Sequence, residues 1–403
     1  MSKLMFRLAL LGALIGFAVY YQNQQNAALN TAASRGAKMR ELLLPGLQIE
    51  NLRRFVIRDE KATVSINVAN DLKSATLVER GGYPASIDKL STVMSDLREQ
   101  KISSKVPVGK SAWAKSKLKA PGESGEGIGT QVEMIDGNGK AFATLILGSN
   151  TDISGGATPN PMMGSATQRL VRNLADNETI WQVSNTFFDL EAKPENWLDK
   201  AFIDVQKIRQ ISVTAGKPEE SWSISRAKET DTDFTLDNPK PGESLDNSKI
   251  TASSILSAAS FNDVSAKDKA AELLKGATKV RITTFDAFTY DLQVAKLSKD
   301  GSDKYHLAIE VSADIPKART AAKGEKEEDK KKADEAFNAE KKTKEDKLAK
   351  EQKLSGWVYE VSEYTVNNLL KKRADLVKAE PAKEPAAAPA SPAPASPAPA
   401  TKK

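Results

Sequence analysis

The chain has no cysteine, and its 403 residues include a single histidine. Without thiols it forms no disulfide and offers no cysteine nucleophile or thiolate metal site. One imidazole excludes a zinc centre built on two or three histidines, and a Ser-His-Asp triad would require His306 itself. Because His306 stands in the strand-like sequence Tyr305-His306-Leu307 and no G-x-S-x-G motif accompanies it, we predict a structural histidine.

Phosphate-binding loops and distinctive carboxylate pairs are missing as well. Gly127-Ile128-Gly129 and Gly137-Asn138-Gly139 lack both a third glycine and a following Lys-Ser/Thr, which favours turns. No acidic pair has an apolar surround that would raise a pKa for acid catalysis. We therefore expect no catalytic, cofactor-binding or metal-binding residues and a protein that is not an enzyme. An enzyme acting on cell-wall material through two carboxylates is the least favoured alternative.

Charge and aromatic content are unremarkable. The 59 basic and 53 acidic residues leave a formal charge of +6, much of it from local runs, so no nucleic-acid partner is indicated. Aromatic residues make up 6% of the chain. Those that could form a carbohydrate platform mostly occupy strand-like positions, which favours core packing. They are Trp181, Trp197, Trp222, Trp357 and Tyr359.

One segment is nominated as an exposed contact site, the loop Pro159-Asn160-Pro161-Met162-Met163. Adjacent exposed methionines make adaptable interfaces, although a buried flap fits the same sequence.

A long apolar run occurs at the N-terminus, from Leu8 to Tyr21, preceded by Lys3 and Arg7. Counting from Leu4, with Arg7 reaching the headgroups, the run approaches the lower limit of about 17 residues for a spanning helix. The flanking cations predict a cytoplasmic N-terminus and an extracytoplasmic, periplasmic bulk. Residues 1–38 are thus predicted to be a membrane anchor and tether. A signal peptide cleaved near Ala28 or Ala33 is the alternative.

The chain also contains an internal repeat. The spacing of Ile49, Leu52, Phe55 and Ile57 recurs in Val205, Ile208, Ile211 and Val213. The sequence Ile-Trp-Gln-Val-Ser at 180–184 matches Val-Tyr-Glu-Val-Ser at 358–362, and a helix-like stretch follows each. The repeat predicts two modules, 43–198 and 199–378, each of ordinary domain size.

In the first module the apolar pattern predicts strands at 52–58 and 63–68. A helix is expected after Ser86 as N-cap, with one apolar face formed by Ile87, Leu90, Val93, Met94 and Leu97. Asp136-Gly137-Asn138-Gly139 predicts the turn of a hairpin between 132–134 and 142–147, and 149–164 is expected to be a loop.

The second module repeats this order. Strands are expected at 207–213 and 222–224, and then a helix carrying Ile250, Ile255 and Leu256. A hairpin is expected between 280–282 and 290–294, around a turn near Asp286 that lacks glycine. The predicted class is α+β, two tandem repeats of a largely antiparallel sheet with packed helices, behind an N-terminal transmembrane helix.

Two segments interrupt the repeat. Residues 321–353, rich in lysine, glutamate, aspartate and alanine, favour a long solvated helix or a helical hairpin, with a disordered loop as the alternative. The tail 379–403 alternates alanine, proline and serine, which predicts an extended, disordered end.

The motifs Ser221-Trp222-Ser223-Ile224 and Gly356-Trp357-Val358-Tyr359-Glu360-Val361 resemble a bacterial family of unknown function, DUF4340. The resemblance covers about 43–376 in two copies. It implies single-pass anchored, extracytoplasmic α+β modules, often encoded beside ABC-transport components of the kind associated with gliding motility. The motifs are structural, so the resemblance implies no site residues. The chain departs from the pattern at Val64, which replaces the strand tryptophan, and in its charged insert and tail.

These observations favour a membrane-anchored accessory protein of the bacterial inner membrane that engages ABC transporter subunits or other envelope proteins. The alternative is a ligand-binding module for an envelope polysaccharide or lipid, held in the cleft between the two repeats.

Overall fold

The computed structural model describes residues 41–152, 167–176, 179–256, 258–299, 301–321 and 325–378. The chain divides into two compact units, which we call module 1 (1–201 with 262–266) and module 2 (202–261 with 267–403). The predicted anchor 1–38, the Pro159–Met163 loop and the tail 379–403 lie outside the described residues. Within the described ranges, none of the helices combines the length and apolar character needed to cross a bilayer.

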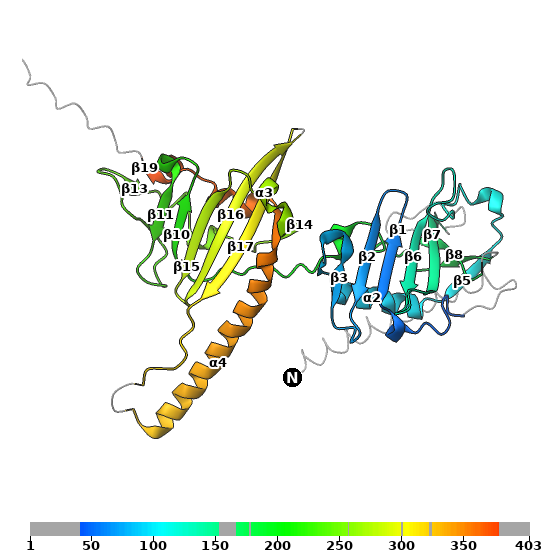
Figure 1. Ribbon diagram of the computed structural model, residues 1–403, viewed down its shortest axis with the longest axis horizontal. Helices are drawn as coiled ribbons and strands as arrows, with labels where there is room; N and C mark the ends of the chain where they lie inside the picture. The colour runs from blue at the N-terminus through cyan, green and yellow to red at the C-terminus, as the bar shows by residue number, and fades with distance from the viewer. Residues whose placement is uncertain are drawn as a thin grey trace, which may run out of the picture. The chain divides into compact units, whose positions relative to one another are not determined.

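Module 1 is built on a nine-stranded antiparallel sheet with the order β4-β3-β2-β1-β6-β7-β8-β9-β5 (Figure 1). The strands are β1 (Arg54–Arg58), β2 (Thr63–Val68), β3 (Ala75–Leu77), β4 (Tyr83–Pro84), β5 (Ile102–Val106), β6 (Thr130–Ile135), β7 (Ala141–Asp152), β8 (Thr167–Asn173) and β9 (Ile180–Val183).

Module 2 carries an eight-stranded sheet with the order β12-β11-β10-β15-β16-β17-β18-β14. Its strands are β10 (Ile208–Thr214), β11 (Trp222–Ser225), β12 (Thr235–Leu236), β14 (Phe261–Ala266), β15 (Thr278–Thr284), β16 (Phe288–Lys299), β17 (Ser302–Ala313) and β18 (Trp357–Val361). By strand pairing β14 belongs to this sheet, although the division into compact units groups its residues 262–266 with module 1. A separate ribbon pairs β13 (Ser244–Leu245) with β19 (Val377–Lys378).

Apart from β4, which has no counterpart in module 2, the two sheets have the same strand order, with β10 in the place of β1, β15 in that of β6, and β18 in that of β9. Strand registers agree with this assignment. Phe55 lies opposite Met134 as Ile211 lies opposite Ile282. Because the match extends to individual residue pairs, positions in one sheet can be assigned to positions in the other.

The apolar patterns in the sequence of module 1 coincide with the strand and the helix that they predict. Val64, Ile66 and Val68 alternate toward the core in β2, with at most 7% of each residue exposed. Helix α2 (Ile87–Glu99) begins after Ser86, whose hydroxyl accepts a hydrogen bond from the Lys89 backbone N–H at 3.3 Å. Its Leu90, Val93, Met94 and Leu97 are buried. These predictions are confirmed.

Both hairpins are confirmed. In the β6–β7 turn Asp136 Oδ1 accepts from the backbone N–H groups of Asn138 and Lys140 at 2.9 and 3.0 Å. The β15–β16 turn has no glycine, and Ala287 takes a φ of 74° instead. The predicted loop begins too early, because β7 continues to Asp152.

The helix expected around Ile250, Ile255 and Leu256 is wrong. Only a 3-10 turn, η6 (Ala252–Ser254), forms there, and Leu256 has a φ of 50°. The three side chains are buried, so their spacing reflects an irregular segment packed on the core rather than a helical face. The helix-like stretch expected after 180–184 is also wrong, since Phe187 turns the chain with a φ of 50°. After 358–362 the short helix α5 (Glu363–Val366) does follow.

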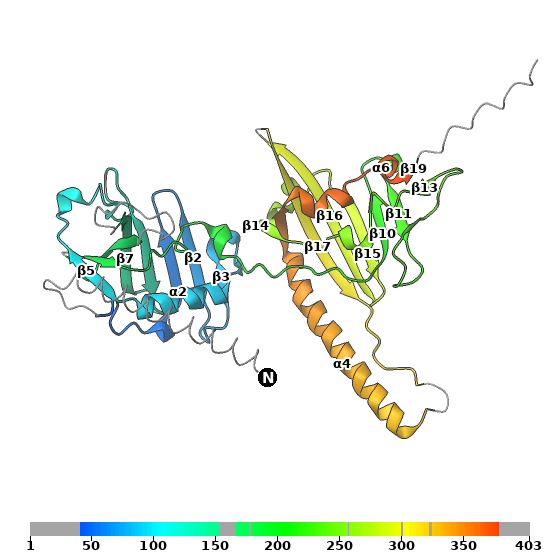
Figure 2. The same cartoon turned by 180° about the vertical axis from the view of Figure 1, so that it is seen from behind.

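The charged insert contains a single long helix, α4 (Glu327–Gln352), which runs away from the sheet of module 2 (Figures 1 and 2). Its buried residue is Glu351, near the C-terminal end. The Glu351 carboxylate accepts hydrogen bonds from Tyr290 Oη at 3.0 Å, the Asp204 backbone N–H at 3.0 Å and Lys347 Nζ at 2.6 Å. Burial, together with the Glu351 charge, raises the pKa of Tyr290. The helix is therefore fixed at its base.

Candidate functional site

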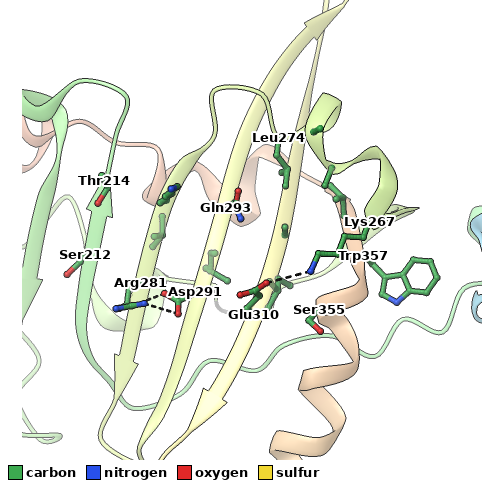
Figure 3. Close-up of a pocket in the computed structure, with 18 residues that line it drawn as sticks. Ser212, Thr214, Lys267, Leu274, Arg281, Asp291, Gln293, Glu310, Ser355 and Trp357 are labelled. Carbon is green, nitrogen blue, oxygen red and sulfur yellow. Dashed lines mark hydrogen bonds and ion pairs between the residues drawn. The ribbon is translucent and has the colours of Figure 1, made fainter.

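One face of the module 2 sheet is an open hollow with a volume of about 760 Å³ (Figure 3). Because side chains alternate along a strand, four neighbouring strands direct polar groups to this same face. We call the following residues the open face: Ser212 and Thr214 of β10, Lys279 and Arg281 of β15, Asp291 and Gln293 of β16, and Glu310 of β17.

Ion pairs join charges on and beside the open face. The Arg281 guanidinium donates to both Asp291 oxygens across the strands, at 2.7 and 3.1 Å, and this hydrogen bonding raises the pKa of Arg281. Lys267 Nζ lies 3.7 Å from Glu310 Oε1. All four side chains are substantially exposed, so these pairs contribute little to stability. They leave groups of both signs accessible to a bound chain.

A short apolar wall borders the open face. It is formed by the half-buried Ala270, at the start of α3 (Ala270–Leu273), and Leu274, just after its end, and it follows the charged turn η7 (Lys267–Lys269). The Trp357 indole, at the start of β18, points away from the strands of the floor (Figure 3). The arrangement offers hydrogen-bond donors, acceptors and charges beside a small apolar strip, which suits the binding of a polar chain.

The equivalent face of module 1 is partly covered by the protein itself, since Arg58 remains exposed there and Glu133 and Thr144 remain half-buried. By strand register, Val56, Gln131 and Ile146 occupy the positions of Ser212, Lys279 and Gln293. The three module 1 residues are buried, whereas Gln293 and Lys279 are exposed. The difference arises from residues 107–129, between β5 and β6, which we call the cover segment.

The cover segment brings its own small core. Trp113 and Leu118 pack against Leu170 of β8 and Ile180 of β9. Arg172 of β8 holds the segment from below, with its guanidinium 3.9 Å from the Trp113 ring centroid and Nη1 donating to the Leu118 carbonyl at 2.8 Å.

Two glycines allow the cover segment to approach the sheet. A Cβ on Gly129 would lie 2.3 Å from the Lys117 carbonyl oxygen, and one on Gly148 would lie 2.7 Å from Leu118 Cδ2. Module 2 has Ala277 and Ala295 at these places, before Thr278 and after Val294. There the connection 267–277 is shorter than the cover segment and leaves the face open.

Of the aromatic residues considered from sequence, Trp357 borders the hollow. His306 is 6% exposed in β17 and does not line the hollow. Burial lowers its pKa, and its Nδ1 has no hydrogen-bond partner among the described residues. No group of His, Asp or Glu suited to a metal ion occurs in the part of the chain that the structure describes.

Of the five aromatic residues considered as a platform, Trp197, Trp222 and Tyr359 are buried, and Trp181 and Trp357 are half-buried. They are distributed over both modules. The open face was not predicted from sequence, because its polar side chains resemble those of any solvent-exposed strand. The sequence feature that could have indicated the open face is the shorter length of the connection 267–277 compared with 107–129.

The family model described as Domain of unknown function (DUF4340) matches residues 76–277. No curated protein and no solved structure matches the chain significantly.

Proposed function

The chain belongs to the DUF4340 family, and we propose on that premise that it is a membrane-anchored, extracytoplasmic accessory protein of a bacterial inner membrane. In this role it binds a protein of an ABC-type transport or other envelope complex. The family description assigns no activity, so the argument depends on the surfaces of the chain.

One observation carries the proposal. Two equivalent sheet faces differ in that the chain's own cover segment covers part of one, through Trp113 and Leu118, whereas the other is open. The open face combines paired charges with an apolar strip at Leu274 and Ala270. Such a surface supports binding of a polar polypeptide segment from another protein.

The N-terminal sequence supports the location. An apolar run preceded by Lys3 and Arg7 is the pattern of an anchor with an extracytoplasmic bulk. Anchoring raises the local concentration of both modules near membrane partners and strengthens otherwise weak contacts. The resemblance to proteins encoded beside ABC-transport components points to the class of partner.

The test is in-cell crosslinking followed by purification of the intact protein from membranes, beside a chain lacking residues 1–34. Recovery of ABC permease or ATPase subunits with the intact chain alone supports the anchored accessory role. Failure to enrich any membrane-transport or envelope protein counts against it. Glycan or lipid retained equally by both chains, without a protein partner, would favour the ligand-binding alternative.

A matched variant sharpens this test. Arg281→Glu places two acidic side chains in direct opposition on the open face, since Asp291 is its cross-strand partner. Both residues are partly or fully exposed, so folding should survive while recovery of the partner falls. Arg54→Glu, at an exposed position of module 1, is the control and should leave recovery unchanged.

A further inference from the structure

One position of the open face carries a much smaller side chain than its counterpart in module 1. Ile146, which matches Gln293 of module 2, has Arg172 of β8 as its cross-strand partner. The corresponding partner of Gln293 is Ala308 of β17, which lines the hollow. Ala308 therefore occupies the position of Arg172, with a methyl group in place of a long cationic side chain.

In module 1 this position supports an aromatic ring. The Arg172 guanidinium lies 3.9 Å from the centroid of the Trp113 ring, which the cover segment contributes. The ring also belongs to the buried cluster that contains Ile180, the neighbour of Arg172 in β9. Trp113 is left only 8% exposed. The arginine and the ring together cover β8 and β9 at this place.

Module 2 supplies no ring at the equivalent place. The connection 267–277, which takes the position of the cover segment, contains no aromatic residue. Trp357, the aromatic residue that borders the hollow, points away from the strands of its floor (Figure 3). Two half-buried apolar side chains, Ala308 on the floor and Leu274 on the wall, line the hollow, and we call them the apolar patch. The described residues place no large side chain over the apolar patch.

The charges of the open face leave one cation over. The two ion pairs described above each balance one charge of either sign. Lys279 is exposed, lines the hollow and has no ion-pair partner among the described residues. Gln293 lies between Lys279 and Ala308 across three adjacent strands, and this spacing places them about 10 Å apart. The open face therefore favours an acidic group at about that distance from the apolar patch.

We propose that the open face binds a segment of the partner protein that carries an aromatic residue and an acidic residue about three residues apart. An extended chain advances about 3.3 Å per residue, so this spacing spans the distance between Ala308 and Lys279. The ring packs over the apolar patch, as Trp113 covers the sheet of module 1, and the carboxylate pairs with Lys279. The inference rests on the proposed function and names the chemistry of the bound segment.

The experiment places a photoreactive benzoylphenylalanine at position 293 of the full-length protein in its native membrane. Gln293 is exposed and lies between the two positions that the segment contacts. Position 302, where an exposed serine stands in β17 outside the hollow, is the control. We expect a polypeptide adduct from 293 well above the yield from 302. Mass spectrometry should map it to a segment with the proposed aromatic and acidic pair.

Each other result is decisive. An adduct with a polypeptide segment that lacks the pair overturns the inference and leaves the proposed function standing. Adducts that contain glycan or lipid overturn it as well. A yield from 293 equal to that from 302, while the partner is still recovered from membranes, shows that the partner binds elsewhere. No partner recovered with the unsubstituted chain makes the proposed function fail, and the inference with it.

Two matched pairs of variants complete the test with the segment identified in this way. Ala308→Arg puts the module 1 side chain into the hollow and should weaken binding of the segment about tenfold or more. Ser312→Arg, exposed in the same strand outside the hollow, should leave binding unchanged. Lys279→Glu should also weaken binding, whereas Lys331→Glu, at an exposed lysine of α4, should not.

Thermal unfolding of the full-length variants separates loss of binding from loss of folding. Lys279 is exposed, so Lys279→Glu should keep the midpoint of the unsubstituted chain. If Ala308→Arg lowers the midpoint, the result for Lys279→Glu decides. Binding by Ala308→Arg and Lys279→Glu equal to that of their controls overturns the inference.

Discussion

The matching faces of the two sheets differ in how far they are buried. In module 1 the cover segment packs on part of the face and Ile146 is fully buried, whereas in module 2 the equivalent Gln293 is exposed. Apart from β4, the strand order is the same in both. The comparison shows that one connection, placed between equivalent strands, decides whether a sheet face serves stability or is free to bind.

The strand sequences agree with this difference in burial. Val56 and Ile146 in module 1 stand where module 2 has Ser212 and Gln293. Burial of polar side chains without partners is costly, so the covered face is apolar at these places and the open face is polar. The modules therefore differ in the polarity of their strand residues as well as in the length of the connection.

The largest expected effect comes from removing the centre of the cover. Trp113→Ala should lower the free energy of unfolding of module 1 by about 3–5 kcal/mol, because the ring fills the cluster over Leu170 and Ile180. Denaturant titration of the full chain measures it. Trp357→Ala, at a half-buried residue beside the open face, is the control and should cost clearly less. Equal losses would contradict the assignment of the cover as core.

A smaller effect tests the close approach of the cover. Gly148→Ala puts a Cβ 2.7 Å from Leu118 Cδ2 and from the Ser116 carbonyl oxygen, so the segment must shift. We expect a loss of about 1–3 kcal/mol and faster amide exchange in 107–129. The reverse change at the matching place, Ala295→Gly, should cost about 0.5–1 kcal/mol. Unchanged exchange in the cover segment would show that the glycine is dispensable.

A substitution at Arg172 tests how β8 binds the cover segment. Arg172→Met should cost about 1–2 kcal/mol, because it removes the cation stacked on Trp113 and the hydrogen bond to the Leu118 carbonyl. Arg281→Met on the open face should leave the unfolding midpoint unchanged, since its ion pair is exposed. A larger loss at Arg281 than at Arg172 would reverse the comparison.

The smallest expected effect is on the stability of module 2 at low pH. In module 2 hydrogen bonds from Arg373 hold the pKa of Glu243 below its ordinary value. A carboxylate with a pKa lower in the folded than in the unfolded state stabilises the fold above the unfolded pKa, and this contribution is lost as pH falls through the folded pKa. Glu243→Gln should therefore flatten the decline of module 2 stability below about pH 4.5. Thermal unfolding at stepped pH measures it, and an unchanged slope contradicts it.

Sequence patterns predicted the elements that depend on interactions between residues close in sequence. The alternation in β2, the capped face of α2 and both hairpins depend on neighbours in sequence, and they formed as expected. The segment around Ile255 did not, because tertiary packing buries its apolar residues without a helix. The open face depends on the length of a distant connection, which no strand pattern contains.

The place of β5 predicts an order of assembly for each module. The chain makes β5 before β6, yet β5 pairs with β9, as Ile102 opposite Val183 shows, and β14 lies beside β18 in the same way. Consecutive hairpins from β6 to β9 close over short distances, whereas β5 must wait for the last of them. Until then its backbone donors and acceptors stay unpaired and open to other chains. Each module is thus completed last by a strand that the ribosome delivers early, and a chaperone or early docking would matter most in that interval.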